Sequence, residues 1–156
     1  MILEIKHYPD PILKKKCKEV KNVNEQEKLI KDMFDTMYSN EGVGLSACQV
    51  GVAKQIAVVD IGEGPMVFIN PIIVSKKGSI VSEEGCLSIP GVFLKIKRVK
   101  EIEIEALNEK GERFNIKAVG LLSRCLQQEM DHLNGILIID RLPKIKKIKM
   151  KLFKKI

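Results

Sequence analysis

The stretch from Gln128 to His132 places an amide, a carboxylate and an imidazole at helical spacing. Positions 128 and 132 are four residues apart, so on a helix they project from one face, where two imidazoles could bind a metal ion while Glu129 directs its carboxylate at the water on that ion. Here the first position holds a glutamine, whose amide oxygen is a harder and weaker donor than imidazole for iron or zinc. The stretch therefore predicts a metal-binding helix with its own base and one poor ligand.

Two segments upstream make this pattern specific. Residues 42–49 (GVGLSACQ), 84–88 (EGCLS) and 128–133 (QEMDHL) occur in this order along the chain. Together they closely resemble the three signature motifs of peptide deformylases, the metalloenzymes that remove the formyl group from new bacterial polypeptides. The resemblance begins near residues 8–13 (YPDPIL) and covers roughly residues 2 to 142. It implies an α+β domain, and it implies a histidine where this chain has Gln128.

The resemblance also implies a metal centre. Cys86, His132 and Gln128 fall on the ligand positions for one divalent ion, with Fe²⁺ expected in the cell and Zn²⁺, Ni²⁺ or Co²⁺ as alternatives. Glu129 falls on the base that takes a proton from water and passes it to the leaving amine. Occupancy of the site is expected to be weakened by Gln128.

Other residues would hold the substrate. The side chain of Gln49 and the backbone N–H of Leu87 match the groups that stabilise negative charge on the formyl oxygen. Four residues are expected to bind a substrate lying extended along the site, two of them beside its methionine side chain: Gly42, Val43, Gly44 and Leu45, with Val43 and Leu45 at the methionine. Glu84 is expected to be solvated or to pair locally.

The glutamine at position 128 leaves three interpretations open. The chain is an active enzyme with Gln128 or a water as third ligand, an inactive relative that binds formyl-methionyl N-termini or the ribosome, or an enzyme whose histidine was exchanged deliberately. Losing one good ligand costs about 3 kcal/mol, roughly a hundredfold in metal affinity, which weakens a site without emptying it. A zincin-type protease is a weaker possibility because it needs a histidine at position 128.

Composition bounds the class of protein. A chain of 156 residues with 45% apolar residues fits one domain with a real core. The four cysteines, at positions 17, 48, 86 and 125, form no CxxC pair, which argues against a zinc ribbon and a disulfide framework. The N-terminal residues do not resemble a signal or membrane segment, so a cytoplasmic protein with no membrane or DNA partner is expected.

The net charge of +7 has a local origin. Seven of the 27 lysines and arginines lie in residues 144–156, which contain no acidic residue, so the remaining twenty balance the 20 acidic residues. In that segment Ile145, Ile148, Leu152 and Ile156 recur at helical spacing. We expect a catalytic domain over residues 1–143 and a basic amphipathic helix over 144–156. Three placements of this helix are open: on the domain surface, against ribosomal RNA or, least favoured, on a membrane.

Periodicity predicts the elements that position the site. Asn24 with Glu27 resembles a capping box, and apolar residues then recur at helical spacing up to Gly42. Strand patterns cover residues 55–61, 66–74 and 79–82, and 101–106 returns through 114–116 as a hairpin. A helix follows over 121–133, closed by Asn134 and Gly135, and residues 136–139 resemble a final strand. These elements predict a single α+β domain with antiparallel or mixed sheets packed around the metal-site helix.

Overall fold

The structure is a computed structural model and describes residues 1–148. Its strands are β1 (Gly44–Ser46), β2 (Ile56–Val59), β3 (Met66–Lys77), β4 (Ile80–Cys86), β5 (Ile89–Arg98), β6 (Glu101–Leu107) and β7 (Arg113–Ala118). The two long α-helices among the described residues are α1 (Glu27–Ser39) and α2 (Gly120–Leu133). Short 3-10 helices are η1 (Pro11–Lys14), η2 (Val23–Gln26), η3 (Ala47–Val50) and η4 (Ile138–Arg141).

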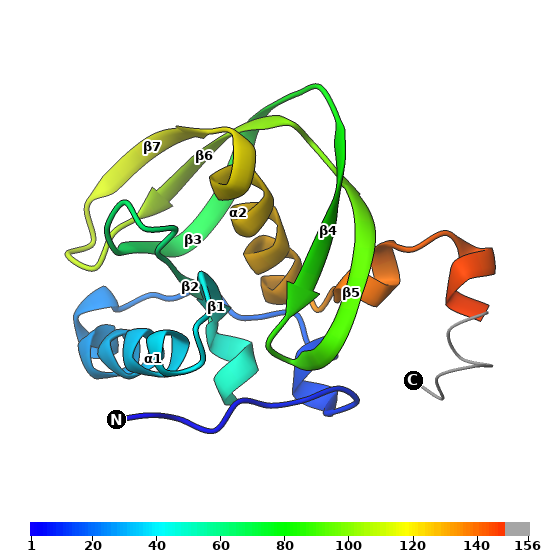
Figure 1. Ribbon diagram of the computed structural model, residues 1–156. Coiled ribbons are helices and arrows are strands. Elements are labelled where there is room, and N and C mark those ends of the chain that lie inside the picture. Colours follow the sequence, from blue (N-terminus) through cyan, green and yellow to red (C-terminus); the bar gives the residue numbers. More distant parts are fainter. Residues whose placement is uncertain (149–156) are drawn as a thin grey trace.

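The strands form two separate sheets. One has five strands in the order β1-β2-β3-β6-β7, the other consists of β4 and β5, and every pair of neighbouring strands is antiparallel. In Figure 1, α2 runs between the larger sheet and the β4–β5 pair, while α1 lies beside β1 and β2. The predicted α+β domain with sheets around a central helix is confirmed.

Helix α2 lies at the centre of the domain, and more than half of its side chains are buried. Its buried residues are Ser123, Cys125, Leu126, Gln127, Glu129, Asp131, His132 and Leu133. The helix ends where predicted, since Asn134 is the C-cap and Gly135 follows with φ of 74°. A Cβ at Gly135 would also lie 2.4 Å from the carbonyl oxygen of Lys14, so this end requires glycine for both conformation and space.

The predicted hairpin is the β6–β7 pair. Ile102, Ile104 and Ala106 are buried while the glutamates between them are partly exposed, as the strict alternation requires. The turn is held by Asn108, whose side-chain oxygen accepts hydrogen bonds from the backbone N–H groups of Lys110 and Glu112. The alternation of apolar and charged residues in β6 thus predicted which face of the sheet packs against α2.

Several expected local features are wrong. The capping box at Asn24 is absent because residues 23–26 form η2, and α1 begins at Glu27 behind Gln26 without a side-chain cap. Residues 138–141 form η4 in place of a strand, since the Asp140 carboxylate accepts from the Leu137 N–H and closes a tight turn. Strand β5 was not predicted, because Pro90 and Gly91 interrupt its pattern. Strand β1 pairs with β2, and β5 pairs with the preceding strand β4 across a tight turn beside which Cys86 faces Ile89.

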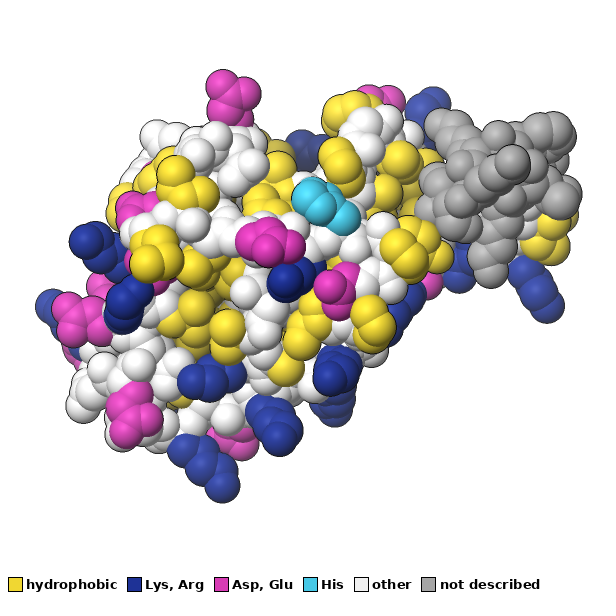
Figure 2. Space-filling view, turned by 90° about the horizontal axis from the view of Figure 1, so that it is seen from below, with side chains coloured by type: hydrophobic (Ala, Val, Ile, Leu, Met, Phe, Trp, Pro, Cys, Tyr) yellow, Lys and Arg dark blue, Asp and Glu magenta, His cyan; other side chains and the backbone are white. Residues whose placement is uncertain are grey.

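The surface of the body shows no concentration of one charge in the view of Figure 2, where Lys and Arg side chains are interspersed with Asp and Glu. Residues 144–148 are helical, with Ile145 and Ile148 exposed by 69% and 52%. Leu152 and Ile156 of the predicted amphipathic helix lie outside the described residues, and the boundary at residue 143 stays a prediction. No helix within residues 1–148 is long and apolar enough to cross a membrane.

Candidate metal centre

The three motif segments meet at one cavity of about 860 Å³. The cavity is lined by α2, by the end of β4 and the start of β5, by residues 39–44 and by the N-terminal segment. Of the predicted site residues it contains eight: Gly42, Val43, Gly44, Gln49, Cys86, Leu87, Gln128 and Glu129. His132 and Leu45 are fully buried and do not line the cavity.

Cys86 and His132 are in direct contact. Cys86 is the last residue of β4, and its Sγ lies 3.4 Å from Nε2 of His132 on the last turn of α2. Burial raises the pKa of the Cys86 thiol to about 12 and lowers the pKa of the His132 imidazole to about 4. The imidazole is therefore neutral at physiological pH, which is the protonation state that a metal ligand needs. Among the described residues, Nδ1 of His132 has no hydrogen-bond partner.

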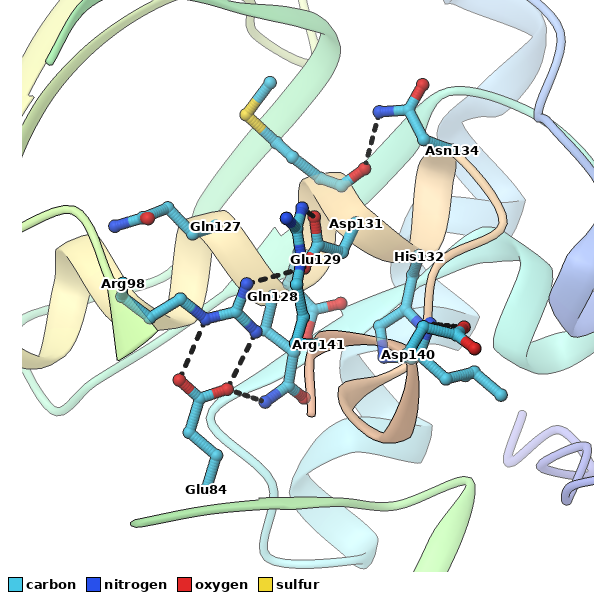
Figure 3. Close-up of polar contacts among 12 residues, drawn as sticks. Glu84, Arg98, Gln127, Gln128, Glu129, Asp131, His132, Asn134, Asp140 and Arg141 are labelled. Carbon is cyan, nitrogen blue, oxygen red and sulfur yellow. Dashed lines mark hydrogen bonds and ion pairs between the residues drawn. The ribbon is translucent and has the colours of Figure 1, made fainter. Parts of the chain in front are cut away.

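The Gln128 side chain is held by its nitrogen. Its Nε2 donates to Oε1 of Glu84 at 3.0 Å and to the carbonyl oxygen of Gly85 at 3.2 Å. Figure 3 shows this nitrogen facing the Glu84 carboxylate, which also receives Arg98. Two acceptors on one side of the amide identify which of its ends is nitrogen. The oxygen is the end of the amide that these contacts leave for a further partner.

Glu129 is a buried carboxylate with one close partner. The hydroxyl of Ser46 donates to its Oε2 at 2.5 Å, a length typical of a hydrogen bond to an ionised acid. Burial raises the pKa of Glu129 to about 7, although the Ser46 hydrogen bond lowers it. A carboxyl group with a pKa near neutrality can accept and return a proton at working pH.

Gln49 presents its amide nitrogen to Cys86. Its Oε1 accepts from the backbone N–H of Ser46 at 3.0 Å, so this end of the amide is fixed on η3. Its Nε2 donates to Oγ of Ser88 at 3.1 Å and lies 3.7 Å from Sγ of Cys86. The arrangement places a neutral N–H donor at the cavity wall beside Cys86, as the predicted role requires.

The glycine-rich segment fits closely around the Glu129 carboxylate. A Cβ at Gly44 would lie 2.9 Å from Oε1 of Glu129 and 2.7 Å from Sγ of Cys125, so only glycine leaves room here. Val43 is 42% exposed and lines the cavity. Leu45 differs from expectation, because it packs in the core with α1 and β2 and does not line the cavity.

Two groups at the site were not identified from the sequence. Ser46 lies inside the first motif, and its type gave no signal because its role depends on contact with α2, 83 residues away. Glu84 was expected to be solvated or to pair locally; it is not solvated, because it is buried and its Oε1 lies 2.8 Å from Nη2 of Arg98. The two residues lie on the paired strands β4 and β5 but are not register partners, so their ion pair is not evident from the sequence.

Comparison with known proteins identifies the family. The family model described as polypeptide deformylase matches residues 2–148. A peptide deformylase of Clostridium botulinum is 52% identical over 141 residues, covering 90% of this chain and 96% of that protein. One of Neisseria meningitidis is 48% identical and covers 99% of this chain and 96% of that protein.

Solved structures agree with this match. A peptide deformylase from Legionella pneumophila has a TM-score of 0.91 at 42% identity and covers 99% of this chain and 96% of that one. A peptide deformylase from Synechococcus elongatus in complex with actinonin has a TM-score of 0.92 at 41% identity, covering 98% and 85%. The chain belongs to the polypeptide deformylase family.

Proposed function

We propose that this protein is a metal-dependent hydrolase that removes the N-formyl group from the N-terminal formyl-methionine of nascent polypeptides. The observation that carries the proposal is the convergence of Cys86, His132, Glu129 and Gln49 on one cavity in a chain of this family. These residues come from β4, α2 and η3, so their meeting is a property of the fold and not of one local motif.

The residues present fit a metal ion. Two donors on one tetrahedral ion, sulfur at about 2.3 Å and nitrogen at about 2.0 Å, lie about 3.5 Å apart. Sγ of Cys86 and Nε2 of His132 are separated by 3.4 Å. Within residues 1–148 no cluster of three or more His, Cys, Asp and Glu could hold a metal, so the third protein donor would be Oε1 of Gln128.

The donor set bears on the choice of ion. Thiolate, imidazole and amide oxygen together suit borderline divalent ions, and Fe²⁺ is the proposed native metal, with Zn²⁺, Ni²⁺ or Co²⁺ as substitutes. When bound, the metal supplies Lewis acidity that makes water a nucleophile at neutral pH. Gln128 in place of imidazole is proposed to lower the occupancy of this site.

The protein side chains would carry the remaining chemistry. Glu129 accepts the proton from the attacking water and delivers it to the leaving amine, for which a pKa near 7 is suitable. The Nε2–H of Gln49 and the backbone N–H of Leu87 stabilise the charge that develops on the formyl oxygen. Because the site is buried, these hydrogen bonds are stronger than they would be in water.

The substrate would lie along the glycine-rich segment. Gly42, Val43 and Gly44 line the cavity and offer backbone to an extended peptide, with Val43 beside the methionine side chain. Leu45 supports this segment from the core. Formyl-methionyl N-termini of nascent chains are the proposed partners.

One measurement on one sample tests the function. Purified protein is assayed for bound metal and for release of formate from a formyl-methionyl tripeptide, with the acetyl-methionyl tripeptide as control. Formate release that requires bound metal supports the proposal. Metal-loaded protein that releases no formate would refute it.

A second candidate function has one observation in its favour. The amide of Gln128 already donates to Glu84 and Gly85, and an amide is a weaker donor than imidazole, so the chain could bind formyl-methionyl N-termini without hydrolysis. Binding of the formyl-methionyl tripeptide by calorimetry without formate release identifies this function. Turnover excludes it.

The C-terminal segment supports a further proposed partner, the ribosome. The body of the chain is neutral, whereas residues 144–156 carry seven lysines, and the described Ile145 and Ile148 are exposed. Lysines that meet RNA phosphates give steeply salt-dependent binding. A cytoplasmic location follows from this proposal.

The ribosome proposal is tested by truncation. Full-length protein is expected to co-sediment with ribosomes at low salt, and a version ending at Pro143 is not. Both should hydrolyse a short free peptide equally. Equal co-sedimentation of the two versions would assign the segment to the protein surface alone.

A further inference from the structure

Ser46 is fully buried directly behind the proposed base. It ends β1, where it pairs with Ala57 of β2, and its backbone N–H donates to Oε1 of Gln49. Its hydroxyl lies 2.5 Å from Oε2 of Glu129 and 3.1 Å from the carbonyl oxygen of the same residue. Strand pairing and the Gln49 contact fix the backbone of Ser46, so its hydroxyl is a stationary group against which α2 is placed.

The two oxygens of Glu129 have different surroundings. Oε2 accepts the Ser46 hydroxyl, on the side away from the cavity. Oε1 lies against Gly44, which lines the cavity together with Glu129. A carboxylate can rotate about its last torsion, which is broad and nearly two-fold, so an anchor on one oxygen decides which oxygen faces the substrate.

We propose that Ser46 is a positioning residue that anchors Oε2 of Glu129 and thereby presents Oε1 to the reacting water and the leaving amine. The inference rests on the proposed function and deepens it. Ser46 does not line the cavity and has no exposed surface, so it acts through Glu129 and does not touch substrate.

The same residue couples the base to the oxyanion donor. The Ser46 N–H holds Oε1 of Gln49, and this leaves Nε2 of Gln49 directed at Cys86 and Ser88. One residue of β1 thus sets the orientation of both proposed catalytic side chains, one through its hydroxyl and the other through its backbone. Substitution of the side chain separates the two roles, because any residue except proline retains the N–H.

Ser46→Ala tests the hydroxyl, with Ser123→Ala as matched control. Ser123 is equally buried on α2, but its hydroxyl contacts Gln127 and not the cavity. We expect Ser46→Ala to lower kcat by about tenfold to a hundredfold, the loss of one hydrogen bond to a charged group, with KM changed less than about twofold. Metal content should equal that of the unsubstituted protein. A kcat no lower than that of Ser123→Ala, or a loss confined to KM, would overturn the inference.

A second readout does not depend on turnover. Crystal structures of the unsubstituted protein and Ser46→Ala are compared at Glu129, whose carboxylate should turn or occupy two orientations in the variant. An unchanged single orientation contradicts the anchoring role. If the unsubstituted protein and Gln128→His both release no formate, the proposed function fails, and the crystallographic comparison still decides whether Ser46 anchors Glu129.

Discussion

Buried charges are paired with opposite charges on one face of α2 and lack such partners on the other face. On the face toward β5, Arg98 donates to both oxygens of Glu84 at 2.8 and 2.9 Å and to Asp131 at 2.5 Å, and Arg141 adds two bonds to Asp131. On the cavity face, Glu129 has a single close partner, a neutral hydroxyl. Glu84, Asp131 and Glu129 are all buried, but only the first two are paired with cations.

The difference distinguishes a structural cluster of paired charges from a carboxyl group suited to proton transfer. Burial disfavours the charge of Arg98, yet its two carboxylate partners outweigh burial and raise its pKa. For Glu129 burial is the largest effect, and the pKa rises to about 7. A fully paired cluster stays ionised and rigid, whereas a carboxyl without a cation can exchange protons.

Neighbouring glutamines on α2 repeat this contrast. The Gln127 amide is used at both ends, because its oxygen accepts from the Val99 N–H and its nitrogen donates to Val99 and Ser123. For Gln128 only the nitrogen has partners among residues 1–148. We interpret Gln127 as structural and Gln128 as the residue that retains an oxygen for a ligand.

The largest effect should come from Glu129. Glu129→Gln keeps the shape of the side chain but cannot accept a proton, so kcat should fall by about 10²- to 10⁴-fold while bound metal is retained. Because the change removes a buried carboxyl that has no cation partner, the midpoint of thermal unfolding should not fall. Metal analysis, formate release and calorimetry on one preparation test this. Loss of metal together with activity would show that Glu129 is a ligand.

Removing a charge from the paired cluster on the β5 face of α2 should instead lower the free energy of unfolding. Arg98→Leu leaves Glu84 buried without a cation and leaves Asp131 with Arg141 alone, and removal of one partner of a buried pair costs about 3 to 5 kcal/mol of unfolding free energy. Arg113→Leu is the control, since Arg113 is 82% exposed and its distance to Glu105 is 3.8 Å. That change should cost less than about 1 kcal/mol. Equal denaturation midpoints for the two variants would contradict the distinction.

Gln128→His should increase metal affinity and activity at the cavity face of α2. An imidazole is a better donor than an amide, and the adjacent Glu84 carboxylate could accept its second N–H, so metal affinity and formate release should each rise at least about tenfold. Gln127→His is the control, because it breaks the contacts to Val99 and Ser123 and should lower stability without raising metal affinity. Competition with a chelator measures affinity. Unchanged affinity in Gln128→His would show that position 128 does not reach the metal.

Local pattern was enough to predict α2, the β6–β7 hairpin and the three motif segments. Each depends on residues within about one helix or one hairpin, where periodicity reports which side is buried. At β5 and η4, however, the local sequence pattern was misleading. Pro90 and Gly91 hide the alternation of β5, and the Asp140 contact that closes η4 outweighs the strand character of Ile136 to Ile139.

The fine geometry of the candidate site required the fold. The orientation of the Gln128 amide depends on Glu84, 44 residues away, and the anchoring of Glu129 depends on Ser46, 83 residues away. Leu45 shows the same limit, because a side chain inside a motif was expected to line the cavity and instead fills the core. Sequence indicates which residues take part, and tertiary contacts decide what each atom faces.

The smallest predicted effect concerns an exposed counterpart of the Ser46–Glu129 contact. The hydroxyl of Tyr38 donates to Oδ2 of Asp60 at 2.7 Å on the surface. Here the hydrogen bond is the main influence, so it raises the pKa of Tyr38 to about 12 and lowers that of Asp60, whereas at Glu129 burial prevails and the carboxyl pKa rises. The two contacts share their chemistry and differ in exposure to water.

A spectroscopic titration checks this last prediction. In a Tyr8→Phe background, where Tyr38 is the only tyrosine, tyrosinate absorbance should appear near pH 12, and Asp60→Asn should move it toward the ordinary value of about 10. Since the folded pKa is raised, the small stabilisation is complete below about pH 10 and is lost as the pH rises through about 12. A titration unaffected by Asp60→Asn would mean that water, and not the carboxylate, controls the exposed hydroxyl.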